Sequence, residues 1–242
     1  MIYAYRTEIG QRQTNQDYFS VPEAGEKPVV VVADGMGGHK AGNVASLIAV
    51  DSIREYVERT DEPRKQILLQ HAISYANHRI FDVASSDGDC SGMGTTVIMA
   101  YVEPSRFAYA NVGDSRLYLF DGEHLRQLSR DHSFVEELVQ SGVITRKQAD
   151  THPQRNILTR AVGTAQFVKA DTAQSTWQRG DVLMLCSDGL HGSLSRTEME
   201  NILKNREDLL DACDKLTEAA LANGSSDNVT VVLVENRGGE LL

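Results

Sequence analysis

Five aspartates mark the points in this sequence where apolar runs end or begin. Asp34 closes VVVVA, Asp114 follows YANVG, Asp188 follows VLMLCS, Asp227 precedes NVTVVLV, and Asp17 precedes a shorter apolar run. Carboxylates placed alike at strand ends can converge at one end of a sheet, where they repel one another unless cations lie between them. Because these ligands are oxygens without Cys or His, the sequence predicts a hydrolase that depends on Mg²⁺ or Mn²⁺ rather than zinc.

Composition and charge narrow the class of protein. The chain has 242 residues, a length that one β-rich domain can fill. A formal net charge of −10 argues against a nucleic-acid partner, which would need a basic face. Cys90, Cys186 and Cys213 are odd in number and form no CxxC pair, so they predict reduced thiols in a cytosolic protein rather than disulfides or a zinc site.

Hydropathy and the first residues indicate no targeting segment. Arg6, Glu8, Arg12 and Asp17 do not fit a signal peptide, and no apolar run approaches the ~20 residues that span a bilayer. We therefore expect a cytoplasmic protein without membrane association. No linker, low-complexity segment or repeat divides the chain, so residues 1–242 are expected to form a single domain.

The order of strand-like and helical patterns predicts the fold class. Apolar residues three and four apart predict helices around Val50–Val57, Leu69–Val83 and Leu209–Ala219. The helices are segregated from the hairpin-linked strands, which favours an α+β domain on antiparallel sheets over a doubly wound parallel sheet. The strands are predicted from runs rich in β-branched residues, at Ile2–Thr7, Val29–Ala33, Thr95–Val102, Phe107–Val112, Arg116–Phe120, Val182–Cys186 and Val229–Val234.

Two segments depart from this pattern. Residues 131–163 are polar and helical, and we expect them to form an excursion from the core that acts as a flap. Residues 236–242 are expected to fray.

Asp-Gly pairs occur four times, and such a pair ordinarily marks a turn. Asp121-Gly122 and Asp87-Gly88 are predicted to be turns of this kind. Asp34-Gly35 and Asp188-Gly189 instead end apolar runs and lead into segments without strand alternation. In that setting the carboxylate is held on a rigid strand end, and the glycine lets its own carbonyl approach an ion. Together with Asp227 they are predicted metal ligands.

Arg12 and His39 are the other candidate site residues. The Arg12 guanidinium, close to Asp17, fits a phosphate through two parallel hydrogen bonds, although a lone arginine is more often a surface residue. His39 follows G-M-G-G and would either bind an ion or act as a general acid. The segment 92–96 is predicted to be the entry to a strand, with a contact near the site as the alternative. The remaining histidines are expected to have surface or packing roles: His71, His78, His124, His132, His152 and His191.

Six motifs occur in an order far more specific than any one of them. They are R-Q-T-N-Q-D at 12–17, V-A-D-G-M-G-G-H at 32–39, G-M-G-T-T at 92–96, V-G-D-S-R at 112–116, C-S-D-G-L at 186–190 and S-D-N-V-T at 226–230. In this order they resemble the motifs of the metal-dependent protein phosphatases (PPM, type 2C), and most closely the small bacterial stand-alone members. The resemblance spans Thr7–Glu235.

The resemblance implies a fold and a metal site. The implied fold is a central sandwich of two antiparallel β-sheets flanked by helices on both sides, with two Mn²⁺ or Mg²⁺ ions at one end. By resemblance, Asp34 bridges the two ions, and Asp17 and the Gly35 carbonyl complete one of them. Asp188 and Asp227 hold the other ion.

The resemblance also implies roles in substrate binding and proton transfer. Asp114 matches a position that binds a weaker third ion together with Asp188. Arg12 would bind the substrate phosphate, and His39 matches the proposed general acid. Residues 131–163 match a variable flap beside the active site.

The implied reaction is hydrolysis of phosphoserine and phosphothreonine in proteins. A water that bridges the two cations attacks phosphorus directly, and His39 protonates the leaving oxygen. No phosphoenzyme is needed, and no cysteine has the CxxxxxR setting of a cysteine phosphatase. His191-Gly192 departs from the pattern at a place where a small hydroxyl residue is expected, which affects local substrate contacts.

Two alternatives stay open from the sequence. One is a catalytically silent pseudophosphatase that acts as a binding module; it would have lost a metal carboxylate or the phosphate-binding arginine, and here all are present. The other is a different dinuclear hydrolase, such as a nuclease or phosphodiesterase. The resemblance implies phosphoprotein substrates and an opposing Ser/Thr kinase of the Hanks type, and we expect a monomer.

Overall fold

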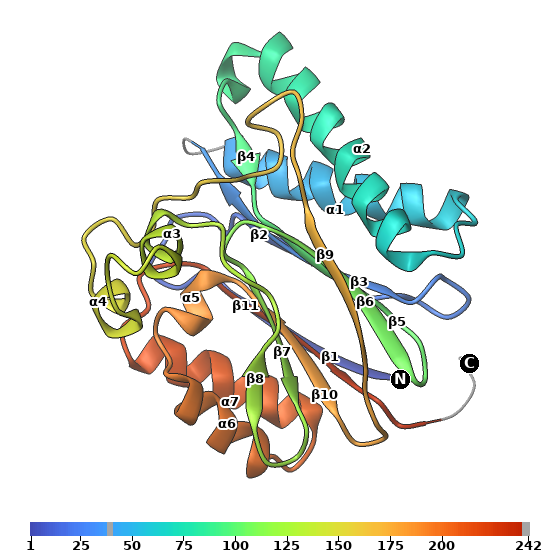
Figure 1. The fold of residues 1–242 in the computed structure, drawn as a ribbon, viewed down its shortest axis with the longest axis vertical. Helices are drawn as coiled ribbons and strands as arrows, with labels where there is room; N and C mark the ends of the chain where they lie inside the picture. Colours follow the sequence, from blue (N-terminus) through green and yellow to red (C-terminus); the bar gives the residue numbers. More distant parts are fainter. Residues whose placement is uncertain (38–40, 239–242) are drawn as a thin grey trace.

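Two antiparallel β-sheets lie face to face at the centre of the molecule (Figure 1). The computed structural model describes residues 1–37 and 41–238. Helices cover the outer face of each sheet, so the predicted α+β sandwich is confirmed.

The first sheet joins the two ends of the chain. Its strand order is β1-β11-β10-β7-β8, with all neighbours antiparallel. Cys186 lies opposite Val231 and Glu8 opposite Val229, so the segments that carry Asp188 and Asp227 leave this sheet at the same end. The strands are β1 (Ile2–Glu8), β11 (Val229–Glu235), β10 (Val182–Cys186), β7 (Arg116–Phe120) and β8 (Leu125–Gln127).

The second sheet has the order β2-β3-β5-β6-β9, and the short β4 pairs with the end of β3. Its register places Asp17 of β2 directly opposite Asp34 of β3. The strands are β2 (Asp17–Ser20), β3 (Val29–Met36), β4 (Gly94–Thr95), β5 (Val97–Val102), β6 (Arg106–Val112) and β9 (Asp171–Thr176).

The helices form one outer layer over each sheet, and a smaller pair lies at one end of the sandwich (Figure 1). Helices α1 (Ala41–Arg59) and α2 (Lys65–Ser86) cover the second sheet, and α6 (Arg196–Lys204) and α7 (Leu209–Ala222) cover the first. The predicted flap contains α3 (Phe134–Gln140) and α4 (Arg146–Asp150). The shorter elements are α5 (Asp188–His191) and a 3₁₀ turn at Gly88–Cys90.

Strict alternation along the strands builds the three apolar layers of the core. In β3, Val30 and Val32 point into the space between the sheets, while Val29 and Val31 pack against α1 and α2. The strand β11 does the same for the other half of the molecule, with Val232 between the sheets and its neighbours against α6 and α7. A strand buried on both faces reads as a continuous apolar run, which is why these two strands were evident from the sequence.

The structure corrects the expected strand list. β3 continues past Ala33 to Met36, so Asp34 lies within a strand rather than at its end. The extension is stabilised from both sides, because β2 pairs with Asp34 and β4 pairs with Met36. Three strands were not predicted: β2 and β8 are only four and three residues long, and β9 (DTAQST) is polar.

The turn predicted at Asp121-Gly122 is confirmed. Asp121 Oδ1 accepts hydrogen bonds from the backbone N–H groups of Glu123 and His124, and Gly122 adopts a φ of 96°. At the other end of the chain, Asn236 is buried and its amide donates to the Pro104 carbonyl, so the fraying expected from residue 236 does not begin there. Within residues 1–37 and 41–238, no helix combines the length and the apolarity needed to cross a membrane.

Candidate active site

The five aspartates come together at one end of the sandwich. Asp17 and Asp34 face each other on β2 and β3, and Asp188 follows β10 as the first residue of α5. Asp114 lies in the turn between β6 and β7, and Asp227 just before β11. The other four carboxylates all raise the pKa of Asp34 through their charge, so both sheets contribute to one aspartate cluster.

Burial and mutual repulsion oppose ionisation of this cluster. Burial is the main cause, and it raises the pKa of Asp17 to about 7, that of Asp188 to about 6 and that of Asp114 to about 8. Burial and the four neighbouring carboxylates raise the pKa of Asp34 well above its usual range. A group of carboxylates that cannot all be ionised alone is the environment that a bound cation stabilises.

Two carboxylate oxygens of the cluster have no hydrogen-bond partner although they are buried. They are Oδ1 of Asp17 and Oδ1 of Asp188. The other Asp17 oxygen accepts a 2.7 Å hydrogen bond from the Ser187 hydroxyl, which fixes the carboxylate and leaves Oδ1 available. Buried carboxylate oxygens without partners are costly, so the donor set fits hard cations such as Mg²⁺ or Mn²⁺.

Gly35 provides a close approach of backbone to backbone beside the cluster. Its N–H donates to the Gln16 carbonyl at 3.0 Å, and a Cβ built on it would lie 2.0 Å from the Gly42 carbonyl oxygen. A Cβ on Gly42 would in turn lie 2.7 Å from the Gly35 carbonyl oxygen, the atom that the resemblance assigns to an ion. Glycine is therefore required at both positions.

The side chains of the cluster do not by themselves complete the coordination of an ion. Across the described part of the chain, no three His, Cys, Asp or Glu side chains are arranged to hold a metal ion by themselves. Mg²⁺ in proteins is commonly held by one or two carboxylates and keeps several waters. The arrangement therefore fits hydrated ions shared among aspartates better than a closed structural site.

The two threonines of the G-M-G-T-T motif hold the Asp34 backbone. The Asp34 carbonyl accepts hydrogen bonds from the Thr95 hydroxyl and the Thr96 N–H, both at 2.8 Å. The Asp34 N–H donates to Thr96 Oγ1 at 3.0 Å, and that hydroxyl lies 2.7 Å from Ser115 Oγ, next to Asp114. The motif, predicted as a strand entry with a contact near the site as the alternative, thus links two of the candidate ligands.

Arg12 lies at the edge of the cluster and forms an ion pair with Asp227. Its Nη2 is 2.7 Å from Asp227 Oδ2, and this hydrogen bond raises the pKa of the guanidinium. The Arg12 side chain is 54% exposed, so a phosphate can reach it. His39, the predicted general acid, lies outside the described residues.

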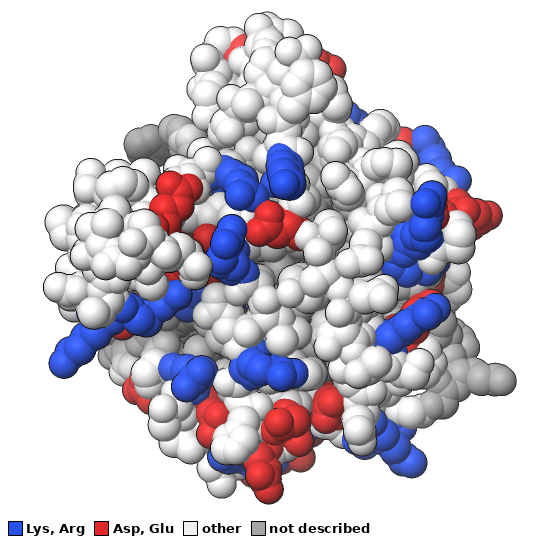
Figure 2. Space-filling model, in the orientation of Figure 1, with Lys and Arg blue, Asp and Glu red and all other residues white. Residues whose placement is uncertain are grey.

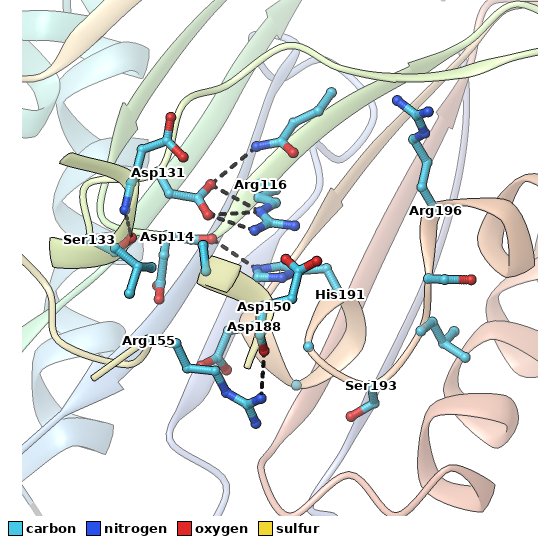
Figure 3. A pocket seen from close by; sticks show the side chains of 18 of the residues that line it. Asp114, Arg116, Asp131, Ser133, Asp150, Arg155, Asp188, His191, Ser193 and Arg196 are labelled. Carbon is cyan, nitrogen blue, oxygen red and sulfur yellow. Dashed lines mark hydrogen bonds and ion pairs between the residues drawn. The ribbon is translucent and has the colours of Figure 1, made fainter. Parts of the chain in front are cut away.

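Two histidines, the buried His132 and the partly buried His191, hold the turn that carries Asp114, a role the sequence did not reveal. Burial lowers the pKa of His191 well below its usual value, so the ring is neutral, and its Nε2–H donates to the Asp114 carbonyl at 3.0 Å (Figure 3). His132 exchanges hydrogen bonds with Gly113: its Nδ1 accepts from the Gly113 N–H, and its own backbone N–H donates to the Gly113 carbonyl. For His191, the position directly after S-D-G-L was the available signal.

Arg116 of the V-G-D-S-R motif is partly buried two residues after Asp114. It binds both oxygens of Asp131 at the base of the flap, with the shortest contact at 2.7 Å, and donates to the Tyr118 hydroxyl (Figure 3). The ion pair joins the flap to the first residue of β7.

An open pocket of about 860 Å³ leads from the aspartate cluster along the flap (Figure 3). Asp114, Asp188 and Asp227 are among the residues that line it. The flap forms one wall and the segment from α5 to the start of α6 forms the other. Asp114, Asp188 and Asp227 can therefore be reached from this pocket.

Comparisons with known proteins agree with this geometry. The model of the protein phosphatase 2C family matches residues 6–233. The serine/threonine phosphatase stp of Listeria innocua is 43% identical over 237 residues, covering 96% of this chain and 94% of that protein.

Solved structures show the same fold. A bacterial serine phosphatase superposes with a TM-score of 0.92 at 35% identity, covering 99% of both chains. The catalytic domain of the phosphatase PstP, solved in complex with two manganese ions, gives a TM-score of 0.86 at 31% identity over 97% of both chains. The chain belongs to the protein phosphatase 2C family.

Proposed function

We propose that this protein is a metal-dependent phosphatase that removes phosphate from serine and threonine side chains of proteins, with its active site at the aspartate cluster. The observation that carries the proposal is the buried carboxylate cluster, with unpartnered oxygens on Asp17 and Asp188, at the head of an open pocket. Family membership and the serine/threonine phosphatase relatives support the same activity.

The proposed ion ligands follow from the cluster and from the family pattern. Asp34 would contribute to holding both ions, one together with Asp17 and the Gly35 carbonyl and the other together with Asp188 and Asp227. Asp114 would hold a weaker third ion together with Asp188. Mn²⁺ and Mg²⁺ both suit these oxygen donors, and the PstP complex with two manganese ions supports a dinuclear site.

The remaining residues bind substrate and move protons. When bound, the cations would supply an activated water and neutralise charge on the phosphoryl group. Arg12, exposed at the rim, would bind phosphate oxygens through its guanidinium, which requires it to turn from Asp227 towards the substrate. His39 would protonate the leaving serine or threonine oxygen.

The biological setting is proposed on the family resemblance alone. The protein would act as a cytoplasmic monomer on phosphoproteins and oppose a bacterial Ser/Thr kinase. The whole chain, residues 1–242, would be one catalytic domain with a flap at about residues 131–163.

The decisive experiment is hydrolysis of a phosphothreonine peptide with EDTA, Mg²⁺ or Mn²⁺ added in turn. We expect phosphate release that requires the metal and is unaffected by thiol alkylation, since no cysteine takes part. Folded protein that releases no phosphate with any metal would contradict the proposal and favour the pseudophosphatase alternative.

A further inference from the structure

The pocket beside the aspartate cluster is larger than the phosphoryl group that the cluster would process. Its volume of about 860 Å³ lies within the range of pockets that enclose a ligand of many atoms. One wall is the flap, and the other runs through Ser193 to the start of α6 at Arg196. The pocket can therefore accommodate residues that flank the phosphorylated side chain.

Most charged side chains along this pocket are already neutralised. Asp114, Asp188 and Asp227 belong to the aspartate cluster. Three arginines of the pocket have carboxylate partners, which are Arg116 with Asp131, Arg146 with Glu136 and, at 3.8 Å, Arg130 with Asp171.

Arg155 and Arg196 remain as cations without a carboxylate partner within residues 1–37 and 41–238. Arg155 donates one hydrogen bond, to the Asp150 carbonyl at 3.0 Å, and Arg196 forms no ion pair or hydrogen bond in that part of the chain. Of the pocket carboxylates outside the aspartate cluster, only Asp150 forms no ion pair with a basic side chain in residues 1–37 and 41–238. Outside the aspartate cluster, these two arginines therefore outnumber the one pocket carboxylate, Asp150, that has no basic partner in the described residues.

The two arginines lie on opposite sides of the pocket. Figure 3 shows Arg155 on the flap side and Arg196 on the side of α6, with Asp188 nearer to Arg155 in this view. Both residues are exposed, so binding an anion costs them little desolvation. Figure 2 shows basic and acidic side chains close to one another near the middle of this face.

We propose that Arg155 and Arg196 form an anion subsite that selects substrate segments with acidic groups beside the phosphorylated residue. This inference rests on the proposed phosphatase function and specifies its substrate class. A guanidinium binds a carboxylate and a phosphate by the same two-pronged geometry, so aspartate, glutamate and a second phosphorylated residue are all suitable neighbours. Because exposed charge pairs contribute little each, the effect is on selectivity rather than on the chemical step.

The test compares Arg155→Gln, Arg196→Gln and the double variant with the unmodified protein in Mn²⁺. Four substrates are used: p-nitrophenyl phosphate and three phosphothreonine peptides, with glutamate, a second phosphothreonine or glutamine in the flanking positions. We expect each substitution to lower kcat/KM for the two acidic peptides by about two- to fivefold, through KM. The glutamine peptide and p-nitrophenyl phosphate should change less than about twofold, and salt should abolish the preference.

Arg179→Gln is the matched control. Arg179 is exposed in the turn before β10, at the opposite end of that strand from Asp188, so this variant should leave every substrate unchanged. An equal loss on acidic and neutral peptides, or no loss on either, would overturn the subsite. If the unmodified protein hydrolyses none of the four substrates, the phosphatase function itself fails, which is a separate outcome. Whether glutamate or the second phosphate gives the larger effect identifies the preferred neighbour.

Discussion

At the scale of single residues, the aspartates serve metal binding at the expense of the stability of the metal-free protein. Asp188→Asn keeps the shape of the side chain and removes one buried charge. We expect metal-dependent phosphatase activity to fall by more than about 100-fold, beyond the effect of losing a residue that merely supports a ligand. The melting temperature of the metal-free variant should rise, because the repulsion that raises the neighbouring pKa values is relieved.

Both readouts are needed for this variant. Activity is measured in Mn²⁺, and melting temperature by calorimetry in EDTA. Asp61→Asn removes an exposed carboxylate that pairs with Lys27 and should change neither quantity by much. A variant with near-normal turnover would exclude Asp188 as a metal ligand.

His191 gives a second prediction at this scale. Its Nε2–H donates to the Asp114 carbonyl, so His191→Leu should loosen the turn that presents this carboxylate. Since one hydrogen bond contributes about 1 kcal/mol, we expect the weakest Mn²⁺ affinity in a calorimetric titration to fall about fivefold. His191→Asn retains an N–H donor and should lose less. Equal affinities in all three proteins would show that His191 only fills space.

The residues of the site differ in how far the sequence could reveal them. Asp34, Asp188 and Asp227 were identifiable because each adjoins a run of apolar residues that is buried on both faces of a sheet. His132, by contrast, has no local signal, since its partner Gly113 is nineteen residues away and meets it only in the folded chain. The position of the end of the flap could not be predicted from the sequence either, because Gly163 binds Asn77 on α2 over a separation of 86 residues.

At the scale of elements, Asn77 connects α2 to the segment that follows the flap. The side chain is buried, accepts from the Gly163 N–H at 2.7 Å, and donates to the carbonyls of Ala165 and Gln166. Asn77→Ala leaves three backbone groups without a partner, so we expect the free energy of unfolding to fall by about 2–4 kcal/mol. Chemical denaturation measures the change, and Ser74→Ala, at a partly exposed position of α2, is the control. A loss below about 0.5 kcal/mol would show that water replaces the side chain.

The sheets explain which elements could be predicted from sequence. β10 and β11 sit in the middle of their sheet, are buried on both faces, and have the predicted bounds to within one residue. The edge strands β2, β8 and β9 carry shorter or polar sequences because one side of each faces solvent or a loop. These segments become strands because they pair with a neighbouring strand, and the β-propensity of their residues does not predict that pairing.

At the scale of the whole molecule, metal binding and folding are linked. Ions that bind the aspartate cluster in the folded state only raise the free energy of unfolding, by about 2.7 kcal/mol for one site at a concentration 100 times its Kd. For a protein of this size that corresponds to a rise in melting temperature of roughly 5–10 °C. An unchanged melting temperature in millimolar Mn²⁺, measured against EDTA, would show that the aspartates do not bind it.

The same linkage fixes the pH dependence of the metal-free protein. In the folded state the pKa of Asp17 is about 7 and that of Asp114 about 8. In the unfolded chain an aspartate has a pKa near 3.9. Between these values the folded protein therefore keeps protons that the unfolded chain has lost. Their stabilising contribution is complete below that ordinary value and is lost as pH rises through the raised ones. Burial lowers the pKa of His132 and His191, which has the opposite effect, but both are neutral in either state above about pH 7.

Between about pH 7 and pH 8 the carboxylates therefore dominate, and the melting temperature in EDTA should fall as pH rises. Asp114→Asn should make this decline shallower, because Asp114 has a higher pKa than Asp17 and asparagine does not titrate. In Mn²⁺ the decline should weaken or reverse, since deprotonated carboxylates bind the ion more tightly. Thermal melts at the two pH values, in EDTA and in Mn²⁺, measure all three effects. A metal-free protein that gains stability over this range would mean that its aspartates are ionised without cations.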